Sequence, residues 1–161
     1  MMMGGSDAPR GCHTRGKTGI RIGKWAAGHI PQRLFPLRAR PASFKSGQTW
    51  HWALIQFHAL GLSFRVLLLL NSEREIYRAI LGVGTEKDFT MICVHEFHAK
   101  EPGWHCHFVE EIKDAPQGWQ RRGMRRFPKG AKMDAVFDVT ENTAIWIAQR
   151  VFRIEERGSL L

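Results

Sequence analysis

The sequence predicts an α+β fold in which a mainly antiparallel sheet of about five strands carries two helices on one face. Short stretches rich in β-branched, aromatic and leucine residues recur between turn residues, which is typical of strands. Two longer stretches repeat apolar residues at helical spacing and begin with residues that cap helices. The predicted order is β-β-α-β-β-β-α, within a single small domain of residues 49–161.

Residues 1–48 are predicted to be a disordered basic arm that precedes this domain. They hold nine Lys or Arg and one acid, so they carry +8 of the total charge of +9. They are rich in Gly, Pro and Arg and lack the periodicity that would bury a core. Such an arm could bind nucleic-acid phosphates without sequence preference, or translation could begin further along the chain. Because it has no apolar signal segment, a cytoplasmic location is expected, although an organellar transit peptide stays open.

The domain is predicted to open with two strands, Trp50 to Phe57 and Leu62 to Leu70, separated by a turn at Gly61. The leucine run in the second strand is too short to span a bilayer, so no membrane association is expected. A helix is predicted to follow, because Ser72 and Glu75 have the spacing of a capping box. The residues after them recur at helical spacing, namely Ile76, Ala79, Ile80 and Val83.

A β-hairpin with histidines on both arms is predicted next. Residues 88–95 have strand composition, Lys100 to Gly103 are turn residues, and Trp104 to Val109 form the returning strand. Half of the eight histidines of the chain fall between residues 95 and 107. They are His95, His98, His105 and His107.

The hairpin register decides which of these histidines share a face, because strand side chains alternate. A loop of residues 99–103 would place His95, His105 and His107 on one face. A loop of residues 100–103 would instead join Glu96 and His98 to His105 and His107. Cys106 faces the other way in both registers.

Three or more such ligands on one face predict a site for a divalent metal ion whose identity the sequence does not give. Imidazole suits Zn, Fe, Mn, Ni or Cu, and three protein ligands with an open position leave room for a catalytic water or a substrate oxygen. The alternative is that the histidines decorate a solvent-facing strand or are satisfied by backbone groups. The candidate ligands are His95, Glu96, His98, His105 and His107.

His105-Cys-His107 followed by Phe-Val resembles the His-hydrophobe-His motif of the HUH endonucleases, the replication initiators and plasmid relaxases. The resemblance covers about fifteen residues. It implies that the strand histidines hold a divalent metal, which polarises a scissile phosphate for attack by a tyrosine. Tyr77, the single tyrosine, would be that nucleophile. It precedes the histidines as in relaxases, but no Tyr-x-x-Lys pattern follows it, and it would also fit the border of the apolar helix face.

A second basic cluster lies between residues 121 and 132, with the aromatic residues Trp119 and Phe127 beside or within it. A cationic loop with aromatics could hold single-stranded DNA or another nucleic acid by phosphate contacts and base stacking. It could equally be a solvated connection. The candidate contacts are Arg121, Arg122, Arg125, Arg126, Lys129 and Lys132.

The chain is predicted to end with a strand at residues 133–139 and a helix from Glu141 to about Arg153, capped by Thr140. Cys12, Cys93 and Cys106 include no Cys-x-x-Cys pair, so no disulfide framework is indicated.

Two functions are consistent with these patterns. The first is a metal-dependent enzyme that nicks or cuts phosphodiesters, similar to HUH proteins. The second is a non-enzymatic module that binds nucleic acid or another protein.

Overall fold

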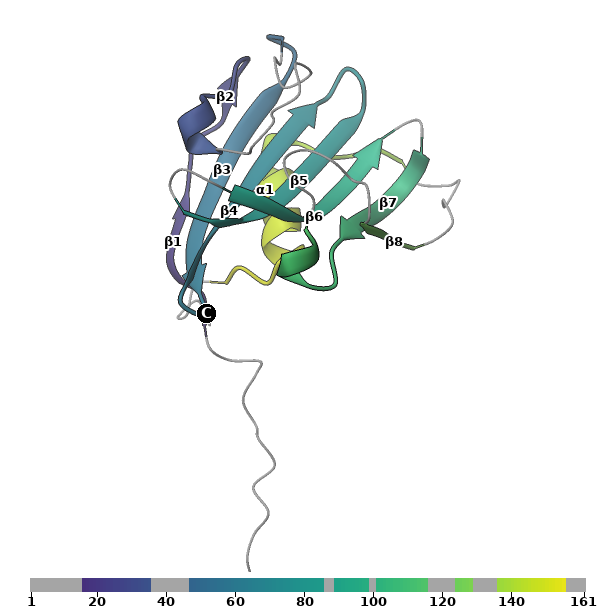
Figure 1. The fold of residues 1–161 in the computed structure, drawn as a ribbon. Coiled ribbons are helices and arrows are strands. Elements are labelled where there is room, and N and C mark those ends of the chain that lie inside the picture. The colour runs from purple at the N-terminus through teal and green to yellow at the C-terminus, as the bar shows by residue number, and fades with distance from the viewer. Residues whose placement is uncertain are drawn as a thin grey trace, which may run out of the picture.

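A computed structural model describes residues 16–35, 47–85, 89–98, 101–115, 124–128 and 136–155. These residues form one eight-stranded antiparallel sheet (Figure 1). The strands are β1 (Thr18–Ile22), β2 (Ala26–Ala27), β3 (His51–Ala59), β4 (Leu62–Asn71), β5 (Ile76–Gly84), β6 (Phe89–His98), β7 (Glu101–Phe108) and β8 (Arg125–Phe127). The described helices are α1 (Glu141–Val151) and two short 3-10 turns, η1 (Gln32–Leu34) and η3 (Ile112–Asp114).

The strand order is β1-β3-β4-β5-β6-β7-β8, and β2 also pairs with β3. From β3 to β7, each strand therefore pairs with the next one along the chain. The β3–β4 turn consists of Leu60 and Gly61, and both have positive φ, at 52° and 72°. Two-residue turns with this backbone match the twist of antiparallel strands, which explains the tight hairpin at Gly61.

The helix predicted after Ser72 is wrong, because this segment is the turn into β5 and β5 itself. The backbone N–H of Arg74 donates to the Asn71 side chain at 3.0 Å, and Glu75 has a φ of 53°, so residues 72–75 form a turn. Asn71 and Ser72 fit either a helix N-terminus or a turn, because Asn and Ser favour both. Strand β5 is buried on both sides, and such strands lack the polar and apolar alternation that distinguishes them from helices.

One face of the sheet, called here the helix-side face, is covered by α1. Ala144 and Ala148 of the helix and the residues Val139 and Ile154 near its ends are buried against it. Its buried strand residues include Ala53, Ile55, Val66, Leu68, Tyr77 and Ala79. Thr140 caps the helix through a hydrogen bond from the Thr143 backbone, so the predicted closing helix and its cap are confirmed.

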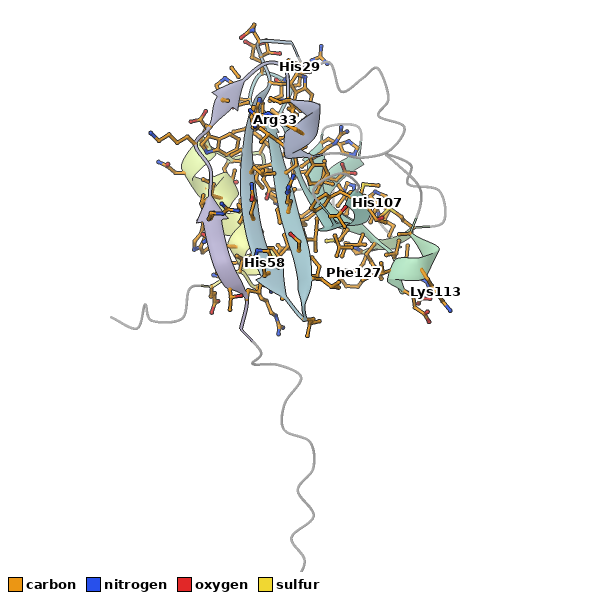
Figure 2. The ribbon with its side chains drawn as sticks, turned by 60° about the vertical axis from the view of Figure 1, so that its left-hand side comes forward. His29, Arg33, His58, His107, Lys113 and Phe127 are labelled. Carbon is orange, nitrogen blue, oxygen red and sulfur yellow. The ribbon has the colours of Figure 1, made fainter. Side chains whose placement is uncertain are left out.

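The opposite face, called here the histidine-side face, is covered in part by the segment that contains η1. Ile30 and Phe35 are buried there among Leu54, Leu67, Leu69, Ile80, Phe89, Met91 and Val94. Gly82 of β5 allows this contact, because a Cβ there would lie 3.1 Å from the Phe35 ring. Figure 2 shows η1, marked by Arg33, and His107 on the side of the sheet away from α1.

The predicted α+β class, with two helices on one face of about five strands, is therefore wrong. The described residues form an eight-stranded sheet with one α-helix, and a folded N-terminal segment lies where no cover was expected. Part of the predicted disordered arm is also folded, since it contains β1, β2, η1 and two buried core residues. The strand predicted at 133–139 is unpaired from Val136 onward, and residues 133–135 lie outside the described residues.

Candidate metal centre

The hairpin of β6 and β7 carries the histidines, as predicted, but in a different register. Glu96 pairs with His105 and Val94 with His107, and the register shifts between Glu96 and His98. β6 ends at His98 and β7 begins at Glu101, so β7 includes residues that both predicted registers assign to the loop. The observed pairing is shifted by two residues from the second predicted register. Because side chains alternate along a strand, a shift of two keeps each side chain on the face predicted for it.

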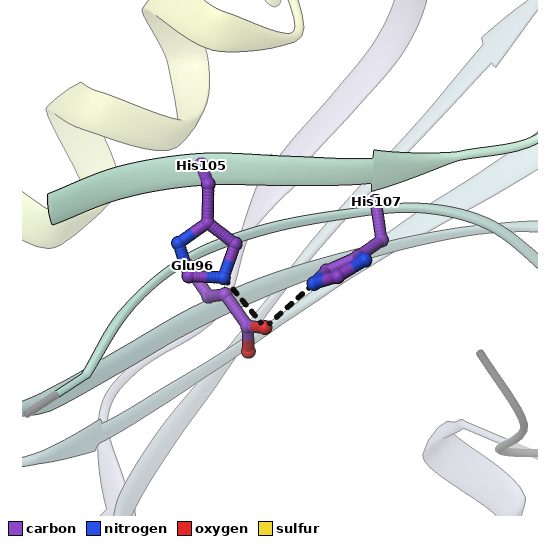
Figure 3. Close-up of side chains that lie close together, drawn as sticks. All are labelled: Glu96, His105 and His107. Carbon is purple, nitrogen blue, oxygen red and sulfur yellow. Dashed lines mark hydrogen bonds and ion pairs between the residues drawn. The ribbon is translucent and has the colours of Figure 1, made fainter. Parts of the chain in front are cut away.

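Three imidazoles on this face approach one carboxylate oxygen. The distance to Glu96 Oε1 is 3.1 Å from His105 Nε2, 3.3 Å from His107 Nε2 and 3.7 Å from His98 Nε2. Figure 3 shows His105 and His107 projecting side by side from β7 toward Glu96 on β6. The Glu96 and His105 side chains are fully buried, and His107 is 13% exposed.

Two further contacts hold this group in place. The other carboxylate oxygen of Glu96 accepts a hydrogen bond of 2.9 Å from Nε of Arg78, which lies directly across on β5. The Nδ1 atom of His105 lies 3.1 Å from the carbonyl oxygen of Gly103. Both anchors orient the atoms of Glu96 and His105 that face one another.

Glu96, His105 and His107 could hold a metal ion, because their ligand atoms all lie within 4.8 Å of one another. Among the described residues, no other group of three His, Cys, Asp or Glu side chains meets this condition. Imidazole with carboxylate is a ligand set that suits divalent transition metals.

His95, a predicted ligand, projects from the helix-side face and does not join this group. Its ring stacks on Trp104 at 5.0 Å and meets the edge of Tyr77 at 6.0 Å. Its Nδ1 atom is buried without a hydrogen-bond partner among the described residues. Burial, with a smaller contribution from nearby His105, lowers the pKa of His95 to about 4, so the ring is neutral at pH 7.

Tyr77 also lies away from the candidate ligands. It belongs to β5 rather than to a helix, it pairs with Phe97, and it is fully buried beneath α1. Its hydroxyl donates to the Ala144 carbonyl oxygen at 3.3 Å, and burial raises its pKa. The expectation that Tyr77 opens onto the histidine site is therefore wrong, because the sheet lies between them.

Two of the six residues predicted to contact nucleic acid lie within the described residues. Arg125 of β8 is exposed and forms an ion pair of 3.0 Å with Glu110. Arg126 lies on the histidine-side face, directly across from His107, and donates to the Pro128 carbonyl oxygen at 2.6 Å. The remaining four, together with Trp119, lie outside the described residues; these four are Arg121, Arg122, Lys129 and Lys132.

Arg78 and the Gly103 carbonyl were not predicted as parts of the site. The signal for Arg78 was a cation between apolar residues, which is ordinary on a helix but notable in a strand buried on both sides. A backbone carbonyl leaves no signal in the sequence.

No protein-family model, curated protein or solved structure matches this chain. The evidence for the candidate metal site is therefore the geometry of its own residues. Among the described residues, no helix has the length and apolar character needed to cross a bilayer.

Proposed function

We propose that this domain binds one divalent transition-metal ion through Glu96 Oε1, His105 Nε2 and His107 Nε2. His98, a predicted ligand, has its Nε2 atom 3.7 Å from the same oxygen but does not belong to the group whose ligand atoms all lie within 4.8 Å of one another, so it borders the proposed site. The ion would lie between strands β6 and β7, on the face of the sheet away from α1.

The observation that carries this proposal is the contact between His105 and Gly103. A carbonyl oxygen only accepts hydrogen bonds, so the proton of a neutral His105 ring belongs on Nδ1. The lone pair of Nε2 then faces the carboxylate oxygen of Glu96 at 3.1 Å. Two acceptors at this distance repel one another unless a proton or a metal ion lies between them. Metal-binding histidines commonly donate their other N–H to a backbone carbonyl in this way.

A proton could also be that cation, in which case His105 would be an imidazolium paired with Glu96. The other imidazoles favour a metal ion instead. One carboxylate oxygen offers about two lone-pair sites, whereas three Nε2 atoms approach Glu96 Oε1. The ligand atoms of a tetrahedral site with bonds of 2.0 to 2.1 Å are about 3.3 Å apart, which is close to the distances from His105 and His107.

The finer proposal is that the bound ion supports phosphodiester hydrolysis, the chemistry implied by the HUH resemblance. When bound, such an ion would polarise a phosphate oxygen and lower the pKa of a coordinated water. Because Tyr77 is buried on the other face, water rather than tyrosine would be the nucleophile. Arg126, beside His107 on the same face, supports this proposal because a guanidinium attracts a phosphate.

Zinc titration of the full chain tests the metal proposal. After treatment with a chelator, the protein should bind one Zn²⁺ per chain in a calorimetric titration. The double variant His105→Ala and His107→Ala should bind at least about 100-fold more weakly, because both imidazole ligands are lost.

A matched control removes two histidines outside the site. His29 and His58 are both exposed, so the variant His29→Ala and His58→Ala should bind zinc as the unchanged chain does. Equal affinity in the two double variants, or no binding by the unchanged chain, would overturn the metal proposal. The second outcome would favour the non-enzymatic module, with His105 as an imidazolium.

A further inference from the structure

Cys93 and Cys106 lie together on the helix-side face of the same hairpin. Cys106 pairs with His95 across β6 and β7, and Cys93 pairs with Phe108, so the two cysteines are diagonal neighbours on one face. Their side chains are close enough to affect one another, because contact with Cys106 raises the pKa of Cys93 and contact with Cys93 lowers the pKa of Cys106. Both are free and partly exposed.

A surface cavity of about 560 Å³ lies beside this part of the hairpin. It is lined by Phe108, Arg125, Arg126 and Phe127. Phe108 is the cross-strand partner of Cys93, and Phe127 is that of Cys106. The cavity is therefore lined by a cross-strand neighbour of each cysteine, and peroxide would reach the thiols through their own exposed surface.

We propose that Cys93 and Cys106 are a peroxide-sensitive dithiol, whose oxidation to a cross-strand disulfide weakens metal binding on the opposite face. The first thiol breaks the O–O bond of hydrogen peroxide, becomes a sulfenic acid and releases one water. The second thiol then attacks that sulfur, the S–S bond forms, and a second water leaves. The thiols lose two electrons in total, and peroxide gains them.

The link to the metal rests on the proposed function and on the position of Cys106. Cys106 lies between His105 and His107, and Cys93 lies three residues before Glu96. A disulfide bond is shorter than any non-bonded contact between two thiols, so its formation draws β6 and β7 together at this point. The ligands lie on the same two strands, and a metal site tolerates displacements of only about 0.5 Å.

A covalent bond explains this pair better than a second metal site. The described residues bring three ligand atoms together only at Glu96, His105 and His107, so the two thiols and His95 do not form such a group. No sequence pattern indicates the pair, because twelve residues lie between the cysteines and only the hairpin register brings them together.

Intact mass measurement tests the disulfide in the metal-free full chain carrying Cys12→Ser. The reduced protein should take up two alkyl groups from iodoacetamide under denaturing conditions. After treatment with hydrogen peroxide it should be a monomer that takes up none, and dithiothreitol should restore both sites. Added Cys93→Ser should leave one thiol that forms no intramolecular bond. Two alkylated thiols after oxidation, or oxidation only to sulfinic acid or dimers, would overturn the proposal.

Zinc titration of the reduced and oxidised forms tests the coupling. The oxidised form should bind at least about 10-fold more weakly. Added Cys106→Ser should make zinc affinity insensitive to peroxide, while equal affinity of the two forms would refute the coupling. If the reduced protein binds no zinc, the proposed metal function fails, and the mass measurement still decides whether the disulfide forms.

Discussion

His95 and His105 lie on adjacent strands of one hairpin, and both are nearly buried, at 8% and 2% exposure. They project from opposite faces of the sheet and meet different neighbours. His95 packs among aromatic rings, and its Nδ1 atom has no partner among the described residues. His105 lies between the Glu96 carboxylate and the Gly103 carbonyl. The comparison shows that burial alone does not distinguish a structural histidine from a candidate ligand, whereas the hydrogen-bond partners do.

The same contrast extends along the two faces. On the helix-side face, His95 continues a row of apolar side chains, with Ala79 and Leu68 as its successive cross-strand neighbours. On the histidine-side face, Glu96 is followed across the sheet by Arg78 and then by Leu69. The candidate site therefore borders the apolar core that Ile30 and Phe35 complete.

Phe35→Ala should have the largest effect on stability, because it removes part of the cover of the histidine-side face. The Phe35 side chain is fully buried, and its ring centroid is 5.9 Å from that of Phe89. Loss of such a ring leaves a cavity, so the free energy of unfolding should fall by about 3 to 5 kcal/mol. Chemical denaturation followed by circular dichroism measures this change.

Phe127→Ala is the matched control, because the Phe127 side chain is 70% exposed. Its effect should stay within about 0.5 kcal/mol. If Phe35→Ala were equally mild, the N-terminal segment would not cover the sheet, and residues 1–48 would behave as the dispensable arm that the sequence predicts.

The sequence could predict most strands but not what covers them. Residues 51–59, 62–71 and 89–98 have strand composition between clear turn signals, and all are strands. Phe35 gave no signal, because its partner Phe89 lies 54 residues further along the chain. Strand β5 was mistaken for a helix because both of its faces are buried, and that in turn depends on the unpredicted cover.

The candidate metal ligands could be predicted more closely than the fold. Alternation along β6 and β7 limited the histidine face to two possible sets of residues, and one of these sets is the observed one. The choice between the sets could not be predicted, because it depends on where β7 begins and on the register shift between Glu96 and His98. The distances that make Glu96 the centre of the group come only from the folded chain.

The next largest effect should be the contribution of His95 to the pH dependence of stability. Its folded pKa of about 4 lies below its ordinary value of 6.5. Between these values the unfolded chain binds a proton that the folded chain does not, so stability falls as the pH falls. The contribution of His95 should decrease by about 2 kcal/mol between pH 7.5 and pH 5. The metal-free His95→Phe variant should lack this component in denaturant titrations at the two pH values.

Phe suits this position because its ring can keep the contacts with Trp104 and Tyr77 and leaves no buried nitrogen without a partner. His58→Phe is the matched control, since His58 is exposed and should leave the pH dependence as it is in the unchanged chain. A His95→Phe variant with the full pH dependence would show that the pKa of His95 is not lowered by folding, and would remove the contrast with His105.

Tyr77→Phe should have the smallest effect on stability. It also tests whether the helix-side face takes part in metal binding or cleavage. The substitution keeps the buried ring and removes only the hydroxyl, whose hydrogen bond to Ala144 is long at 3.3 Å. The free energy of unfolding should fall by about 1 kcal/mol.

Zinc affinity should not change, because Tyr77 and the candidate ligands lie on opposite faces. Any metal-dependent cleavage of single-stranded DNA should also persist, and no covalent adduct of protein and DNA should appear on a denaturing gel. An adduct that disappears in Tyr77→Phe would instead require β5 to expose its tyrosine, and would restore the mechanism implied by the HUH resemblance.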